Sequence, residues 1–390
     1  MRTWPFFSYF FRYVLRAKTR QKLLFIAVTG LFLSAFSLLV IQGIMGGLQK
    51  GLITRSKNVH GSQLIIFKEV TAESLRDLKD ILRKEAIPFY SELEVEVMIK
   101  YKNFVAPAKL HGIDTEDERP RFLAEKDFTG LVMGSELASK IKAQFLDDIQ
   151  LIAPGVTDSL MGEEVPRFVS ENLSDYLYTE LSEVDDFEVW ARSSMVQNLI
   201  RKNGINQIRL FGEVTDKVLK KISKVETTTP FRILSWEKMN ESLVWSLNLE
   251  TKVMLFLFIS MSFLVAIAIT SGLLIFYSKI IKDLMSFWIL GMSQKKLVNL
   301  CFKFTLILSG ITVIAGGIFG HLTLKLLGKF GHKLMPDIFV ERQLPVHLDF
   351  SHIVISLFIP FSISLVFSYF SFVNFRKENQ SFVSIVRSLG

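Results

Sequence analysis

The chain has 390 residues, of which 49% are apolar and 22% are charged, and its formal net charge is +8. The apolar fraction is near the upper end for a soluble protein, while the charged fraction is too high for a chain that is embedded in a membrane throughout. The single cysteine, Cys301, excludes an intramolecular disulfide framework and a cysteine-rich zinc module.

The first 22 residues combine aromatic side chains with a basic cluster and contain no acidic residue. This composition predicts an amphipathic helix in the membrane interface, and a disordered basic leader is the alternative. An uncharged apolar stretch follows and predicts a transmembrane helix over 23–48. Because this stretch is much longer than the apolar region of a signal peptide, about 7–15 residues, we expect an anchor that is not cleaved.

Residues 49–252 have the composition of an ordinary α+β domain. Alternating or continuous apolar residues predict strands over 62–67, 92–100 and 148–153, and residues 230–235 form a further short apolar segment. Helical spacing predicts helices over 71–85, 214–224 and 234–252, and Thr71 offers an oxygen that can cap the first of them. We expect a loop or hairpin over 156–180, and we expect the acidic runs 114–118 and 183–188 to be solvated surface.

Three more uncharged segments follow and predict transmembrane helices over 253–278, 304–324 and 350–375. Between them lie two charged connections, residues 279–303 and 325–349, and residues 376–390 form the tail. The predicted fold class is therefore an integral membrane α-helical protein with four transmembrane helices and a large extracytoplasmic α+β domain between the first two. Gly43 with Gly47, and Gly316 with Gly320, have the spacing that lets helices approach closely.

Basic residues are concentrated on one predicted side of the membrane. The regions 1–22, 279–303 and 375–390 together hold 14 basic and 2 acidic residues, whereas 49–252 holds 28 basic and 33 acidic residues. The positive-inside tendency then places both termini in the cytoplasm and the large domain outside, in a multi-pass protein. The positive charge faces anionic lipid, so we expect no nucleic-acid partner.

Sequence signatures of enzymes are absent from the chain. It contains no phosphate-binding Gly-x-x-x-x-Gly-Lys-Ser/Thr loop, no Gly-x-Ser-x-Gly elbow and no His-Glu-x-x-His pattern. The six histidines show no metal-ligand spacing along the sequence. We expect neither an enzyme nor a cofactor or metal site in this chain.

The connection 279–303 begins with an amphipathic run in which Leu284 and Phe287 share a face. A short helix between two spans is suited to docking a cytoplasmic partner, and a plain interfacial loop explains the pattern equally well. The run continues through Leu290 to Gly291 and Ser293, where a turn is expected.

In this connection, Asp283 is followed by an apolar run and then by a Leu-Gly-x-Ser pattern, which is formed by Leu290, Gly291 and Ser293. This pattern, together with the order of one span, a large outer domain and three spans, resembles the FtsX-like permeases of ABC transporters. Further segments resemble the lipoprotein-releasing LolC/LolE permeases of that family, namely 13–20, 110–114, 133–138, 161–166 and 344–346. The tail departs from the family pattern, because 370–375 and 381–385 replace its Pro-Ala-x-x-Ala box.

The resemblance implies a permease subunit that extracts lipoproteins from a bacterial inner membrane and passes them to a periplasmic lipoprotein chaperone. It implies as partners an ABC ATPase subunit similar to LolD, which carries the ATP and magnesium, and a second permease, identical or homologous. The residues implied for ATPase coupling are Asp283, Leu284, Phe287, Leu290, Gly291 and Ser293.

A cavity for lipid acyl chains requires an apolar lining, and the outer halves of the first two spans supply apolar side chains, including flexible methionines. The predicted cavity residues are Ile41, Ile44, Met45, Leu48, Met254, Phe256, Phe258 and Met261. Each of them could equally face lipid or pack against a helix. Two other functions stay open: an FtsX-like or MacB-like permease that regulates wall hydrolases or drives efflux, and a membrane-anchored sensor or scaffold.

Overall fold

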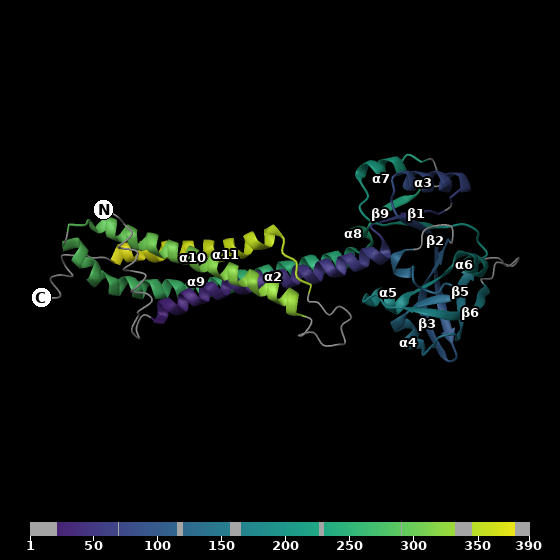
Figure 1. The fold of residues 1–390 in the computed structure, drawn as a ribbon, viewed down its shortest axis with the longest axis horizontal. Helices are drawn as coiled ribbons and strands as arrows, with labels where there is room; N and C mark the ends of the chain where they lie inside the picture. The colour runs from purple at the N-terminus through teal and green to yellow at the C-terminus, as the bar shows by residue number, and fades with distance from the viewer. Residues whose placement is uncertain are drawn as a thin grey trace. The chain divides into compact units, whose positions relative to one another are not determined.

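The structure is a computed structural model that describes residues 22–68, 70–114, 120–156, 165–225, 230–289, 291–331 and 345–378. The chain divides into two compact units (Figure 1). The helical unit consists of Met1–Lys50 and Ser246–Gly390, and the β-rich unit consists of Gly51–Trp245. The predicted interfacial helix over 1–22 lies outside the described residues except for its last residue, and so does most of the predicted tail.

Four long helices make up the described part of the helical unit. They are α2 (Lys22–His60), whose last turns belong to the β-rich unit, α9 (Glu241–Ile289), α10 (Gln294–Phe330) and α11 (Phe350–Glu378). Each contains a stretch long and apolar enough to cross a membrane, and the four candidate spans are Phe25–His60, Glu241–Ile267, Lys295–Phe330 and Phe350–Val373. The four uncharged segments found in the sequence thus all lie in helices.

The helices extend beyond the uncharged segments into the charged connections. Residues 279–289 continue α9, and α10 begins at Gln294 and continues to Phe330. The physical reason is that lysine is a good helix former. Charged residues mark the end of an apolar segment without ending the helical hydrogen bonding.

Glycines of α10 let α2 approach closely, as their spacing predicts. A Cβ at Gly316 would lie 2.7 Å from the carbonyl oxygen of Phe32, and one at Gly320 would lie 3.3 Å from that of Phe36. On α2, a Cβ at Gly47 would overlap the backbone of Pro345, so this glycine accommodates the extended segment before α11. Small residues therefore set the packing of α2 against its neighbours.

Six strands of the β-rich unit form a closed ring. They are β2 (Phe89–Tyr101), β3 (Phe104–Ile113), β7 (Glu188–Arg192), β4 (Leu131–Gly134), β6 (Val165–Leu177) and β5 (Asp148–Val156). They pair in this order, and β5 pairs with β2 to complete the circle. The pairs β3–β7 and β4–β6 are parallel and the others are antiparallel. The ring is a small barrel, whose interior is filled by side chains.

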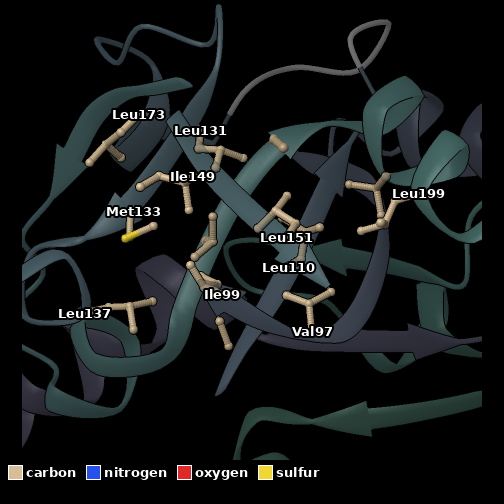
Figure 2. Packing of buried hydrophobic residues seen from close by; sticks show 14 of the residues in the cluster. Val97, Ile99, Leu110, Leu131, Met133, Leu137, Ile149, Leu151, Leu173 and Leu199 are labelled. Atoms are coloured by element: carbon tan, nitrogen blue, oxygen red, sulfur yellow. The ribbon is translucent and has the colours of Figure 1, made fainter. Parts of the chain in front are cut away.

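Among the described residues of the β-rich unit, the barrel interior holds the largest apolar core (Figure 2). Figure 2 shows Ile99, Leu110 and Leu151 directed into it from three strands, and all three are fully buried. Two helices, α4 (Ser135–Ile141) and α6 (Ser193–Ile200), add Leu137 and Leu199 to the same core. Alternation along β2 explains this arrangement, since residues two apart point to the same side of a strand.

A second layer is built on the beginning of β2. Strands β8 (Gln207–Leu210), β1 (Gln63–Ile66) and β9 (Arg232–Ser235) extend the sheet from β2 in that order. Helices α3 (Ala72–Lys84) and α7 (Asp216–Ile222) cover it and share an apolar core with Ile65 and Ile208. A third core joins Val59 of α2 to α5 (Ser182–Phe187) and to the short helix η2 (Arg121–Leu123).

Most local predictions for this unit are confirmed. The three predicted strands and the helices predicted at 71–85 and 214–224 form with shifted ends, and Thr71 caps α3 by accepting a bond from the Ser74 amide. The segment 156–180 contains β6, which makes an antiparallel hairpin with β5 around residues outside the described ranges. The predicted helix 234–252 is interrupted at Asn240, between α8 (Trp236–Met239) and α9.

Candidate functional site

A seam between α2 and α9 in the helical unit is the first candidate site. The hydroxyls of Ser34 and Ser262 lie 3.3 Å apart, and a Cβ at Gly30 would lie 3.6 Å from a methyl of Val265. These contacts identify the sides of the two helices that face each other. At the end of α2 within this unit, the Gln49 amide donates to a carboxylate oxygen of Glu250, so the apolar seam has a polar end.

On α2, three of the four predicted cavity residues share the side that carries Ser34. Ile41, Met45 and Leu48 follow Ser34 by seven, eleven and fourteen residues, which places them on the same side of the helix. Ile41 is 38% exposed and Leu48 is 41% exposed, whereas Ile44 and Met45 are half-buried. This side of α2 is therefore apolar and still accessible.

On α9, three of the four predicted residues share the side that faces α2. Met254, Phe258 and Met261 precede Val265 at helical spacing, and Phe258 is buried while Met261 is 53% exposed. Phe256 lies about 200° around the helix from Phe258 and is 68% exposed on the opposite side of α9. The structure thus separates Phe256 from the other predicted cavity residues.

The predicted coupling residues fall at the end of α9 and the start of α10. The side chains of Asp283, Leu284 and Phe287, and the whole of Leu290, lie outside the described residues. Gly291 has a φ of +96°, a conformation that favours glycine, and Ser293 occupies the N-cap position of α10. The turn expected after Leu290 therefore lies between the end of α9 and the start of α10, and within the described residues no further helix lies between these two.

A buried ionic cluster in the β-rich unit is the second candidate site, and the sequence did not predict it. The guanidinium of Arg209 on β8 donates to Glu92 and, over 2.9 Å, to Glu94, both on β2. Nδ1 of His111 on β3 lies 3.0 Å from the second carboxylate oxygen of Glu92. Glu92, His111 and Arg209 are almost completely buried. The carboxylates of Glu92 and Glu94 therefore lie beside two basic side chains, those of Arg209 and His111, on the outer side of the barrel.

Glu188 on β7 extends the cluster toward the end of α2. One carboxylate oxygen lies 3.8 Å from Nε2 of His111 and the other lies 3.8 Å from Nδ1 of His60. The ring of His111 stacks on Trp190, with centroids 5.5 Å apart. The cluster thus connects three strands of the barrel with β8 and α2.

The electrostatics of the cluster favour charged Glu92 and His111. Burial alone would raise the pKa of Glu92, but the charges of Arg209 and His111 outweigh it and lower this pKa from 4.5 to about 2. Burial acts to lower the pKa of His111, and the neighbouring Glu92 raises it above the ordinary value of 6.5. Burial raises the pKa of Glu188. The charged form of Glu92 is thus stabilised by its partners.

Glu92, Glu94 and His111 also have ligand atoms within 4.8 Å of one another, a group that could hold a metal ion. Arg209, however, already bonds to both carboxylates. A divalent cation would have to displace a guanidinium that is buried with them, so the arrangement fits an ion-pair network better than a metal site.

One prediction about the acidic runs is wrong. The run 183–188 was expected to be solvated, but Asp185 is 1% exposed and Glu188 is 6% exposed. Asp185 accepts bonds from the amide and the hydroxyl of Thr179. Its carboxylate therefore accepts the hydrogen bonds of a local turn, and the composition of the run does not indicate this role.

The last turns of α2 are held in the β-rich unit by a further set of polar contacts. Nε1 of Trp236 donates to the hydroxyl of Ser56 over 2.9 Å, and both side chains are buried. Lys57 pairs with Glu237, Arg55 pairs with Glu180, and Arg209 donates to the carbonyl oxygen of His60. The end of α2 is thus attached both to α8 and to the sheet.

No family model and no curated protein matches this chain. Among solved structures, it is similar to the extracellular domain of the noncanonic ABC-type transporter YknZ from Gram-positive bacteria. The likeness covers 44% of this chain and 100% of that chain, with 10% sequence identity and a TM-score of 0.28. The chain's own features define its class: four candidate membrane helices, with a β-rich unit between the first and the later three.

Proposed function

We propose that this chain is the permease subunit of an ABC-type transporter that releases lipoproteins from a bacterial inner membrane. The observation that supports the proposal is that α2 is one unbroken helix. It forms one side of the apolar seam, and its last turns are fixed in the β-rich unit by hydrogen bonds. Such a helix can transmit a tilt of the membrane spans to that unit. The order of motifs that resembles the LolC/LolE permeases supports lipoproteins as the substrate.

In this proposal the ATP-hydrolysing step belongs to a separate ABC ATPase subunit with its magnesium ion. ATP-driven closure displaces the turn around Gly291, the spans tilt, and the acylated end of a lipoprotein leaves the seam. The β-rich unit, on the periplasmic side, passes the lipoprotein to a chaperone, and a second permease completes the complex. The accessible apolar side chains of α2 and α9 support this assignment, because acyl chains need an apolar lining without unpaired polar groups.

The orientation can be tested by labelling single cysteines in intact cells, in a Cys301→Ala background. We expect Glu213→Cys, an exposed position of the β-rich unit, to react with a reagent that does not cross the inner membrane, and Lys295→Cys to be protected. After membranes are opened, Lys295→Cys should react as well. Labelling at 295 with protection at 213 would invert the topology and contradict the proposal.

The coupling assignment can be tested with Phe287→Ala. We expect this variant to lose co-purification of the ATPase and lipoprotein release, because removing an aromatic anchor from an interface costs about 2 kcal/mol or more when it is a hot spot. Ile289→Ala is the matched control, since Ile289 is an exposed apolar residue two positions away, on another side of α9. Pull-down with mass spectrometry measures the binding. Normal ATPase binding by Phe287→Ala, or an equal loss in the control, would refute the coupling role.

The same pull-down separates the alternatives. A wall hydrolase as partner, with an ATPase, would favour a regulator similar to FtsX, and an outer-membrane tunnel would favour efflux of the MacB type. A complex without any ATPase would favour a sensor or scaffold.

A further inference from the structure

Apolar side chains form a row on the outside of the barrel. Met98 on β2 pairs with Pro107 on β3 and with Ile152 on β5, and Ile152 pairs with Phe168 on β6. The four side chains therefore lie side by side across four strands, and we call them the outer row. Phe168 is 56% exposed, Met98 is 38% exposed, Pro107 is exposed and Ile152 is half-buried.

The outer row is not a displaced part of the core. The neighbouring residues Ile99 and Leu151 are fully buried and point into the barrel (Figure 2), which leaves Met98 and Ile152 on the opposite side of the sheet. Apolar residues at four adjacent positions of an exposed sheet face mark an interaction surface rather than isolated surface residues.

Charges of opposite sign border the outer row along β2. Glu96 lies two residues before Met98 and Lys100 lies two residues after it, so each is about 7 Å away along the strand. Both are exposed and, with Met98, project from the outer side of β2. The pattern along the strand is therefore acidic, apolar, basic.

Along β2 this pattern is complementary to itself, and Lys109, the cross-strand neighbour of Glu96 on β3, adds a basic group at the acidic end. If two copies stack face to face about a two-fold axis that runs along the outer row, the direction of β2 is reversed between them. Each apolar side chain then meets its own counterpart, Glu96 of each copy lies opposite Lys100 of the other, and two ion pairs form. Such an isologous contact requires the same patch on both partners.

We propose that the outer row, with Glu96 and Lys100, is the surface through which the β-rich units of two copies of this chain contact each other. The patch is small compared with a stable interface, which buries about 800 Å² per partner. It suffices for two copies held in one membrane, because tethering raises their effective concentration. The proposal does not depend on the substrate, and it holds whether or not lipoproteins are transported.

The test is thiol crosslinking of the full-length chain in membranes, in the Cys301→Ala background. Sheets stacked face to face lie about 10 Å apart, so the two thiols of Met98→Cys, on the proposed axis, face each other within reach of a short bismaleimide, which should convert most of the chain to a covalent dimer. Arg76→Cys, on the exposed side of α3, is the matched control and should stay largely monomeric. Little dimer with Met98→Cys, or as much with Arg76→Cys, would overturn the proposal.

Charge reversal makes the test specific for the two-fold arrangement. Glu96→Lys or Lys100→Glu alone places like charges opposite each other, and we expect dimer trapping by Met98→Cys to fall about threefold to tenfold. The double variant Glu96→Lys with Lys100→Glu restores both attractions and should restore trapping. Loss in the double variant, or adducts of Met98→Cys mainly with a different protein, would assign the surface to another partner and refute the proposal.

Discussion

Arg209→Met is expected to destabilise the β-rich unit by about 3–5 kcal/mol, because breaking a buried ion pair leaves uncompensated charge. Arg209 is the common partner of Glu92 and Glu94, and it also donates to the carbonyl oxygen of His60. Without it, His111 is the remaining basic partner of the buried Glu92. Urea unfolding of the purified full-length chain in detergent, followed by tryptophan fluorescence, measures the effect, because Trp190 stacks on His111.

The exposed Arg121 provides the matched control, and Arg121→Met should change the unfolding free energy by no more than about 0.5 kcal/mol. Adding Glu92→Gln to Arg209→Met should recover part of the loss, because the unpaired buried carboxylate is removed. If Arg209→Met unfolds at the same urea concentration as the native chain, the cluster does not stabilise this unit. The single variant Glu92→Gln completes the cycle: a loss in the double variant equal to the sum of the two single losses would show that the two side chains are not coupled.

Met45→Asp is expected to reduce lipoprotein release about a hundredfold while the chain still inserts and still binds its ATPase. Met45 lies on the side of α2 that faces α9, where the proposed acyl chains bind. A charged side chain in such an apolar environment costs about 2.5–3.5 kcal/mol on insertion scales, and each 1.4 kcal/mol corresponds to about tenfold in occupancy. Release of a lipoprotein from membrane vesicles on addition of ATP measures the effect.

Photo-crosslinking separates this explanation from general damage to the membrane spans. A crosslinker at position 45 or 254 should capture a lipoprotein before ATP is added and lose it afterwards. The same crosslinker at position 256 is the control, because Phe256 lies on the opposite side of α9 from Met254 and Phe258. Capture of phospholipid alone at 45 and 254, or equal capture of lipoprotein at 256, would contradict the proposed seam.

The sequence alone was sufficient for features that depend on composition along the chain. The four uncharged segments identified all four candidate spans, because crossing a bilayer requires a continuous run of apolar residues. Alternation identified β2, and helical spacing with a capping threonine identified α3, because these patterns have periods of a few residues. The long helices continue past these segments, since lysines outside the apolar run can continue a helix.

Only the tertiary structure determined which distant residues meet. Glu92 and His111 are 19 residues apart, and Arg209 is 117 residues from Glu92. The register of the paired strands, which sequence spacing does not encode, brings these three residues together. The same register buries Glu188, although it belongs to an acidic run that was expected to be solvated. The outer row depends on the same register across four strands. Local patterns therefore specify which elements form, whereas the pairing of elements decides which charges are buried and which apolar side chains remain exposed.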